Sequence, residues 1–182
     1  MKKKNFQILL TIFLIFSSRI SKAITFYSGI GGGDSKTKIN NYTLDEKRAF
    51  TFSLGSSFDI PLFPIRLEAE YLKFNSKETN IDTITYGGAI NTYVNLPLLP
   101  ILVPYIGFGI AHLTEKIETE DIIKKSDKKF TPQYILGLDL NLPTFILAGS
   151  IEYRYIKTHF DFQDDTNTSK YYVLLFKTRL KF

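Results

Sequence analysis

Apolar and polar residues alternate with a period of two along most of this 182-residue chain. Alternation of this kind places successive side chains on opposite faces of an extended strand, so it predicts β-strands rather than helices. The pattern recurs along the chain, with turn-forming residues between the stretches. We expect eight strands over residues 25–33, 48–60, 65–75, 83–96, 105–114, 133–142, 145–157 and 171–182.

The connections between these stretches alternate in character. Three of them, "PLFP", "PLLPILVP" and "NLPT", are short and hold six of the seven prolines of the chain. Proline cannot donate a hydrogen bond to a strand ladder, which supports strand boundaries at these places. The other connections are longer and charged, for example "DSKTKINNYTLDEK" and "EKIETEDIIKKSDKKF". An antiparallel fold would therefore have short turns at one end and long loops at the other.

The first 23 residues follow a different pattern. Lys2–Lys4 precede an apolar run over residues 8–16, and Ser21 and Ala23 occupy the −3 and −1 places of a cleavage site. These are the three parts of a secretory signal peptide. A membrane anchor is the alternative, but a nine-residue helix spans only about 14 Å of a ~30 Å hydrocarbon core. We expect a cleaved signal peptide over residues 1–23 and one domain over residues 24–182.

The formal charge of +5 belongs to this N-terminal segment. Residues 1–23 carry five of the 23 Lys and Arg residues and none of the 18 Asp and Glu residues, so the remaining chain has 18 of each. A nucleic-acid-binding protein needs a surplus of cations to neutralise phosphates, so we expect no nucleic-acid partner. Since the chain has no Cys, disulfides, thiolate metal ligands, Cys nucleophiles and a lipidated Cys are excluded.

Several motifs of the chain are similar to one known family. They are the signal peptide, the small-residue strand start "YSGIGGG", the strands "IRLEAEY", "PYIGFGIA" and "SIEYRY", and a last strand, "YYVLLFKTRLKF", that ends on Phe182. Together they resemble the small eight-stranded outer-membrane barrels of the OmpX and OmpA-domain type, which include opacity proteins and surface adhesins. The resemblance implies an all-β fold, an eight-stranded antiparallel transmembrane up-and-down β-barrel in the bacterial outer membrane.

The resemblance also gives the chain terminus a role. A closed barrel pairs its last strand with its first, which would hold the final residue in a ladder. In this family a terminal Phe on an alternating strand resembles the signal read by the barrel assembly machinery, and here it would comprise Phe182, Leu180 and Phe176. Thr178 departs from the family pattern, in which a larger apolar residue is usual.

Alternation alone does not tell which face of the strands lines the interior. A membrane barrel turns its apolar face to lipid, whereas a lipocalin-like soluble barrel turns it inward. Aromatic residues near strand ends suit the interfacial girdles of a membrane barrel, so we favour lipid outside. The residues assigned to these girdles are Phe26, Tyr27, Phe50, Phe58, Tyr71, Phe74, Tyr93, Tyr105, Tyr153 and Tyr155.

With lipid outside, the charged face of the strands lines the lumen. Charges in a poorly hydrated interior must be paired, so we expect a Glu–Arg network across the barrel. Its predicted members are Arg66, Glu68, Glu70, Glu152, Arg154, Lys177 and Arg179. These side chains would fill the interior rather than catalyse a reaction, and an eight-stranded barrel is too narrow to be a porin.

Other motifs give little support to catalysis or cofactor binding. "GIGGG" lacks the last Gly of a dinucleotide-binding loop and no helix pattern follows it. The two histidines, His112 and His159, have no Cys or clustered carboxylates at zinc-ligand spacing. A lipid-acyl hydrolase would need one of them as base, beside Thr114 or Asp161, and neither pair matches a Ser-His arrangement. We expect no catalytic residues, no metal and no cofactor.

The loops remain as the place of function. Rigid scaffolds commonly carry binding groups on loops, and apolar side chains among charges serve as contact anchors. The candidates are Ile122, Ile123, Lys124, Lys125, Phe160 and Phe162. A solvated loop without a partner fits the same composition. We predict an adhesin or interaction protein that contacts outer-membrane lipids and a host surface or extracellular protein; the alternative is a structural or narrow-pore barrel.

Overall fold

The computed structural model describes residues 24–39, 42–60, 64–78, 81–96, 101–119, 122–125, 129–140, 146–162 and 165–182. The predicted signal peptide lies outside these residues. The strands are β1 (Ile24–Ile39), β2 (Tyr42–Phe58), β3 (Ile65–Glu78), β4 (Ile81–Asn95), β5 (Leu102–Thr119), β6 (Ile122–Lys125), β7 (Lys129–Leu140), β8 (Leu147–Phe162) and β9 (Asp165–Lys181). The described residues include no helix that is long and apolar enough to cross a membrane.

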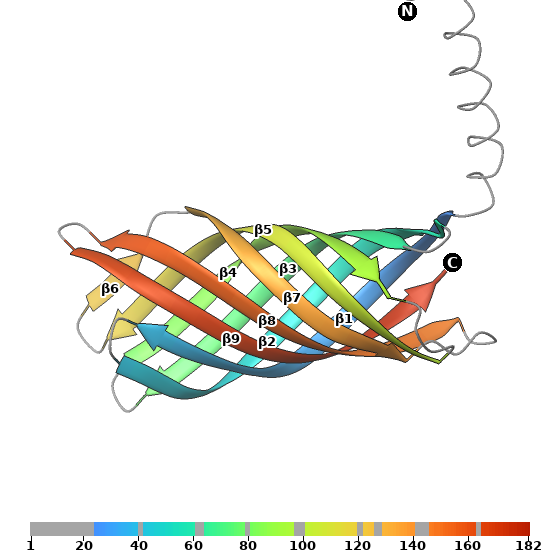
Figure 1. The fold of residues 1–182 in the computed structure, drawn as a ribbon. Coiled ribbons are helices and arrows are strands. Elements are labelled where there is room, and N and C mark those ends of the chain that lie inside the picture. The colour runs from blue at the N-terminus through green and yellow to red at the C-terminus, as the bar shows by residue number, and fades with distance from the viewer. Residues whose placement is uncertain are drawn as a thin grey trace, which may run out of the picture.

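Eight of these strands close into a barrel (Figure 1). Neighbours in the chain pair antiparallel, β5 pairs with β7, and β9 closes the ring by pairing with β1. The short strand β6 pairs with the far end of β5, beyond the ring. The predicted eight-stranded antiparallel barrel is therefore confirmed.

The strands are staggered as well as closed. Register partners traced from Lys36 on β1 around the ring, through Tyr172 on β9 and each strand in turn, return to β1 at Phe26, ten residues earlier. Such a stagger tilts the strands against the barrel axis. A row of side chains in register therefore winds obliquely around the wall.

The two ends of the barrel differ. One end, the turn end, holds the start of β1, the end of β9 and the connections 59–64, 96–101 and 141–146. At the opposite hairpin end, β1 and β2 are separated by two residues, as are β8 and β9. The long connections predicted at this end are therefore formed largely by paired strand, because the strands themselves continue. These extensions are rich in polar and charged residues, so the regular hydrophobic alternation stops before the backbone ladder does.

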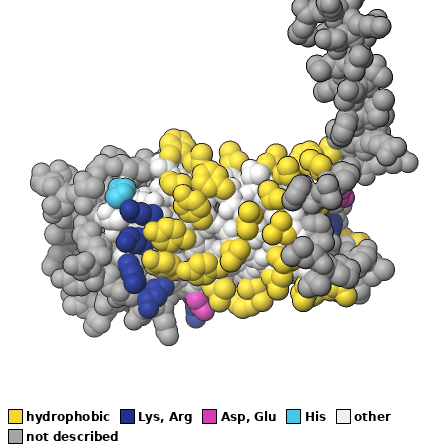
Figure 2. Space-filling view, viewed as in Figure 1, with side chains coloured by type: hydrophobic (Ala, Val, Ile, Leu, Met, Phe, Trp, Pro, Cys, Tyr) yellow, Lys and Arg dark blue, Asp and Glu magenta, His cyan; other side chains and the backbone are white. Residues whose placement is uncertain are grey.

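The outer wall is apolar and the inner wall carries the charges. Phe52 is 47% exposed, Ile90 71% and Phe176 58%, and hydrophobic residues form a band across the face of the wall that Figure 2 shows. A soluble barrel would bury such a band, whereas a membrane barrel presents it to lipid. The prediction of lipid outside is confirmed.

The chain terminus is held as the barrel closure requires. Lys181 lies opposite Tyr27 on β1, and the Phe182 amide donates to the Phe26 carbonyl at 3.0 Å. Phe182, Leu180 and Phe176 all face outward, with 71%, 46% and 58% of each residue exposed. The backbone of the last residue is thus fixed in a ladder while its ring lies on the lipid-facing surface.

Several aromatic residues assigned to the girdles are inside the barrel instead. Tyr27, Phe74, Tyr93 and Tyr105 are at most 3% exposed. Tyr27 and Tyr105 have glycines two residues away on the same strand face, whereas Phe74 shares the inward face of β3 with Glu70. Small residues on the neighbouring strand leave room for a ring. A Cβ on Gly107 would lie 2.7 Å from Tyr93 Cδ1. These four aromatic side chains therefore fill the interior instead of facing lipid.

The interior is filled in layers along the barrel axis. Polar side chains occupy the middle and the turn end, and an apolar layer lies beyond them toward the hairpin end. This apolar layer comprises Ala49, Leu72, Phe74, Ala89, Ala111, Leu113, Ile156, Tyr171, Val173 and Leu175. Leu72, Leu113 and Leu175 are fully buried, which shows that side chains close the lumen at this level.

Candidate functional site

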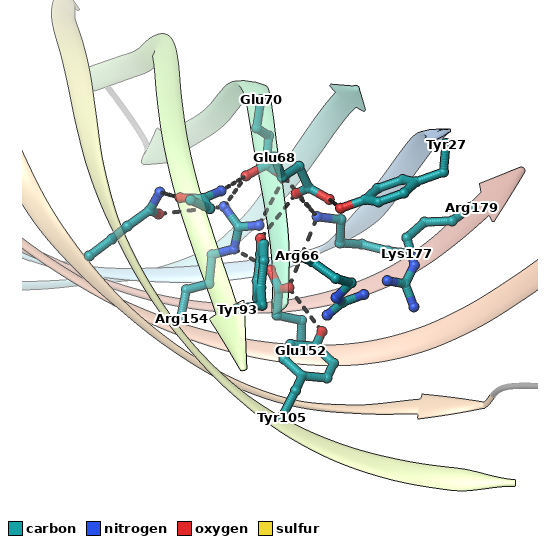
Figure 3. A network of polar contacts seen from close by, with 12 residues as sticks. Tyr27, Arg66, Glu68, Glu70, Tyr93, Tyr105, Glu152, Arg154, Lys177 and Arg179 are labelled. Carbon is teal, nitrogen blue, oxygen red and sulfur yellow. Dashed lines mark hydrogen bonds and ion pairs between the residues drawn. The ribbon is translucent and has the colours of Figure 1, made fainter. Parts of the chain in front are cut away.

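A bidentate ion pair forms the centre of the luminal network (Figure 3). Arg154 on β8 approaches Glu70 on β3 with Nη1–Oε2 at 2.5 Å and Nη2–Oε1 at 2.8 Å. The same guanidinium donates from Nε to Glu152, two residues before it on β8. Arg154 is 0% exposed, so one cation joins two carboxylates across the barrel without solvent.

Lys177 on β9 links the remaining carboxylate to this centre. Its Nζ lies 2.7 Å from Glu68 Oε1, 3.1 Å from Glu70 Oε1 and 4.0 Å from Glu152 Oε2. The ammonium group is compact and carries three donors, so it reaches three carboxylates that point from two strands. Charges from β3, β8 and β9 are therefore held in one cluster.

A second cluster lies nearer the turn end. Asp139 on β7 forms ion pairs with two arginines: its Oδ2 lies 3.1 Å from Arg66 Nη1 and its Oδ1 lies 2.7 Å from Arg179 Nη2. The Arg66 guanidinium also lies 4.5 Å from the ring centre of Tyr105 and 4.7 Å from that of Tyr93. Cation–π contact and the shared carboxylate together hold two buried guanidiniums side by side.

All seven residues predicted for the lumen are inside the barrel, between 0% and 5% exposed. The sequence-based prediction missed Asp139, which shares its strand face with Ile135 and Gly137. It also missed three tyrosine hydroxyls that donate to the carboxylates. They are Tyr27 to Glu68 at 3.2 Å, Tyr93 to Glu68 at 3.0 Å and Tyr105 to Glu152 at 2.9 Å. The segment "PYIGFGIA" could have predicted the inward position of Tyr105, because this tyrosine shares its strand face with the small residues and not with the apolar ones.

Two amides complete the centre of the network. Asn91 Nδ2 donates to Glu70 Oε2 at 2.9 Å, and Gln133 Nε2 donates to Asn91 Oδ1 at 2.5 Å. Both residues are 0% exposed. Asn91 thus adds a donor to the buried Glu70 carboxylate, and Gln133 holds the Asn91 amide in place.

Glycines on β1 make space for the two cations of β9. Gly31 lies opposite Lys177 and Gly29 opposite Arg179. A Cβ on Gly31 would lie 2.7 Å from Lys177 Cγ and 2.6 Å from Thr51 Oγ1. The small-residue strand start therefore leaves room for long side chains to cross the lumen.

The network is balanced in charge. Its four cations, Arg66, Arg154, Lys177 and Arg179, face four carboxylates, Glu68, Glu70, Asp139 and Glu152. Each carboxylate is held by a cation, and three accept further hydrogen bonds from hydroxyl or amide groups. With the apolar layer beyond it, this arrangement occupies the lumen and joins opposite walls of the barrel.

The histidines are placed on the outer side of the strands. The His112 ring lies 4.7 Å from that of Phe130, and His159 Nδ1 lies 2.9 Å from Thr168 Oγ1. The Asp161 side chain is outside the described part. Within the described residues, no three His, Asp or Glu side chains gather as a metal-binding group.

The predicted loop contacts lie at the hairpin end. Residues 122–125 form β6, whose backbone pairs with residues 116–119 of β5, and Phe160 and Phe162 lie in β8. The side chains of all six candidate residues are outside the described part. The limits of the charged segment 115–130 need correction: the buried Glu115 accepts from the Tyr171 hydroxyl at 3.0 Å, and Phe130 lies in β7. The part of this segment between Lys116 and the start of β7 is 117–128.

The comparisons with known proteins agree with this geometry. A family model described as "Outer membrane protein beta-barrel domain" matches residues 8–175. Neisserial surface protein A has a similar structure, with a TM-score of 0.70 at 14% identity over 86% of this chain and 97% of that one. The attachment invasion locus protein Ail of Yersinia pestis gives 0.60 at 16% identity over 88% and 99%. OprG of Pseudomonas aeruginosa gives 0.53 at 13% identity over 88% and 96%.

A search of curated proteins finds no match to the chain. The identities to the solved structures are too low to carry more than the fold. The structural matches nonetheless cover nearly the whole of each solved structure, so the barrel described here corresponds to those barrels over their full length.

Proposed function

Because the chain belongs to the outer membrane protein β-barrel domain family and lies in the bacterial outer membrane, we propose that it is a surface protein that binds a host or environmental partner. The binding part is the set of hairpins at the hairpin end. In barrels of this class the larger extramembrane part is extracellular, and here it is the end opposite both termini.

The observation that carries this proposal is the length of the strands. A tilted strand crosses the hydrocarbon core in about 9–11 residues. β1 has 16 residues, β5 18 and β9 17. The excess lies at the hairpin end, past the apolar band of the wall (Figure 2). The protein therefore holds several paired strands beyond the membrane, which is more than a membrane span requires.

The closed lumen favours this proposal over a narrow pore. A conducting path needs continuous water, and here a balanced charge network is followed by an apolar layer with fully buried leucines. We likewise propose no hydrolytic activity, since His112 and His159 contact Phe130 and Thr168 rather than a buried acid. The fold also occurs in a Neisserial surface protein and in an attachment invasion locus protein, which supports a surface role.

Replacing residues 117–128 with a Gly-Ser segment of equal length should reduce attachment of expressing bacteria to host cells by at least about fivefold, because it removes the candidate contacts on β6. Attachment is counted for a non-adherent strain that expresses the protein. The matched control replaces residues 79–80, the tip between β3 and β4, which carries none of the candidate contacts. Mobility of the unboiled protein in SDS gels verifies that both variants form the barrel. Unchanged attachment of the 117–128 variant would remove this segment from the proposal.

We also propose that residues 1–23 are cleaved and that the last strand directs assembly. Mass spectrometry of the outer-membrane fraction should then find a mature chain that begins at Ile24. Phe182→Ser should lower the amount of this mature chain severalfold, since its ring is exposed on the lipid-facing wall where a partner can read it. Thr178→Ser, an outward change on the same strand, is the control. A chain in the outer membrane that retains residues 1–23 would contradict the cleavage. Equal amounts of the Phe182→Ser and Thr178→Ser variants would contradict the role of the last strand in assembly.

A further inference from the structure

Three lysines lie in register on the outer wall, across three neighbouring strands. Lys170 on β9 is opposite Lys38 on β1 and also opposite Lys157 on β8. Lys38 and Lys157 are exposed and Lys170 is half-buried. Directly opposed side chains of adjacent strands have Cβ atoms about 5 Å apart, so the three ammonium groups lie close enough to contact a single ligand. We call Lys38, Lys157 and Lys170 the lysine row.

Opposed like charges destabilise a sheet, which makes the row unusual. Among the side chains described on the outward faces of β1, β8 and β9, Asp34 is the one carboxylate, and it is four residues from Lys38 toward the apolar wall. No ion pair joins a described carboxylate to Lys157 or Lys170. An external anion would offset the repulsion within the row.

An aromatic row lies next to the lysine row on the same strands. Tyr172 on β9 and Tyr155 on β8 are two residues from Lys170 and Lys157, and their ring centres are 5.3 Å apart. Tyr134 on β7 continues the row at 6.5 Å from Tyr155. Lys38 Nζ lies 5.9 Å from the Tyr172 ring. Tyrosines on the lipid-facing wall mark the level of the lipid headgroups, where their rings are apolar and their hydroxyls are wet.

The lysine row therefore lies just outside the headgroup boundary of the outer leaflet. Two residues correspond to about 6.6 Å along a strand, and to less than that along the membrane normal because the strands are tilted. Figure 2 shows the basic side chains as a column between the apolar band and the hairpin end. They project sideways from the wall, toward the surrounding membrane, and not toward the hairpin tips.

We propose that the lysine row binds the phosphate groups of an anionic lipid of the outer leaflet, with the acyl chains along the apolar wall and the sugar or glycerol part against the tyrosines. This site is separate from the proposed attachment function, since it uses the side of the barrel and not residues 117–128. A cluster of cations at a membrane surface favours anionic lipids by electrostatic attraction.

The test is native mass spectrometry of the folded mature chain in a non-ionic detergent, titrated with lipid A, whose disaccharide carries two phosphates. Phosphatidylethanolamine is the zwitterionic reference. The variant Lys38→Gln, Lys157→Gln, Lys170→Gln should weaken lipid A binding about a hundredfold, since each lysine contributes roughly fivefold near an anionic surface. Mobility in unboiled SDS gels verifies folding. If the triple variant does not fold, Lys170→Gln alone should weaken binding about fivefold.

A matched control removes three outward cations from other strands. Arg48→Gln, Lys73→Gln and Lys116→Gln together change the net charge equally, but these residues are not opposite one another in the register. We expect this control to lose no more than about fivefold in lipid A binding. Equal losses in both triple variants would overturn the proposal in favour of general attraction. Heparin or inorganic phosphate that displaces lipid A from the wild type would overturn it in favour of a soluble anion.

Discussion

Arg154→Met should lower the free energy of unfolding by about 3–5 kcal/mol, because it leaves two buried carboxylates short of their cation. Arg154 is 0% exposed and pairs with Glu70 at 2.5 Å and with Glu152. Lys177 remains near both carboxylates but has a single charge to share among them. The measurement is the folded fraction in urea, read from the mobility of unboiled samples and extrapolated linearly to water.

Two further variants separate the ion pair from simple loss of packing. Glu70→Leu combined with Arg154→Met should be less destabilised than the sum of the single variants, because the pair is then replaced by apolar groups. Lys157→Met, three residues along β8 and exposed, should change the free energy of unfolding by less than about 0.5 kcal/mol. An Arg154→Met variant within about 1 kcal/mol of the wild type would show that the network does not stabilise the barrel.

Gly33→Val should destabilise the barrel by about 3 kcal/mol or more, since it forces the closing pair of strands apart. A Cβ at this position would overlap the backbone carbonyl of Leu174 on β9 and lie 3.0 Å from Leu175 Cα. A backbone cannot rotate away as a side chain does, so the contact between β1 and β9 must open. The same urea titration measures the effect.

The adjacent residue provides the matched control for this substitution. A Cβ on Gly32 would have its nearest neighbour, the Ala49 carbonyl oxygen, at 3.9 Å, which is ordinary van der Waals contact. Gly32 faces outward, where a valine contacts lipid. Gly32→Val should therefore leave stability unchanged or raise it. If the two variants behaved alike, the effect would reflect glycine content and not the closure of the ring.

The sequence was informative wherever one strand face meets lipid and the other the lumen. On β3, the alternation of Leu67 and Tyr71 with Glu68 and Glu70 predicted both the strand and its inward charges, because a period of two follows from strand geometry alone. The alternation was lost near Ile39 and Tyr42, where most residues of the strands are polar or charged. Loops were predicted there, and the structure has continuous hairpins.

The network required more than the pattern of single strands. Asp139 meets Arg66 and Arg179 because β7 lies near β3 and β9 across the lumen, and no spacing within the chain encodes that approach. Tyr93 and Tyr105 were assigned to the membrane surface by their places near strand ends. Both residues lie on the inward face of their strands, so their rings are inside the barrel and contact Arg66.

The sequence by itself determined the eight strands of the barrel, their antiparallel order and seven of the charges that face the lumen, because these depend on periodicity and turn residues within short segments. Tertiary structure decided which charges pair, which tyrosines donate and which lysines become neighbours. The reason is the stagger of the closed ring, which returns to β1 ten residues from its start at Lys36. That offset sets which residues of distant strands share a level, and it exists only when the last strand pairs with the first.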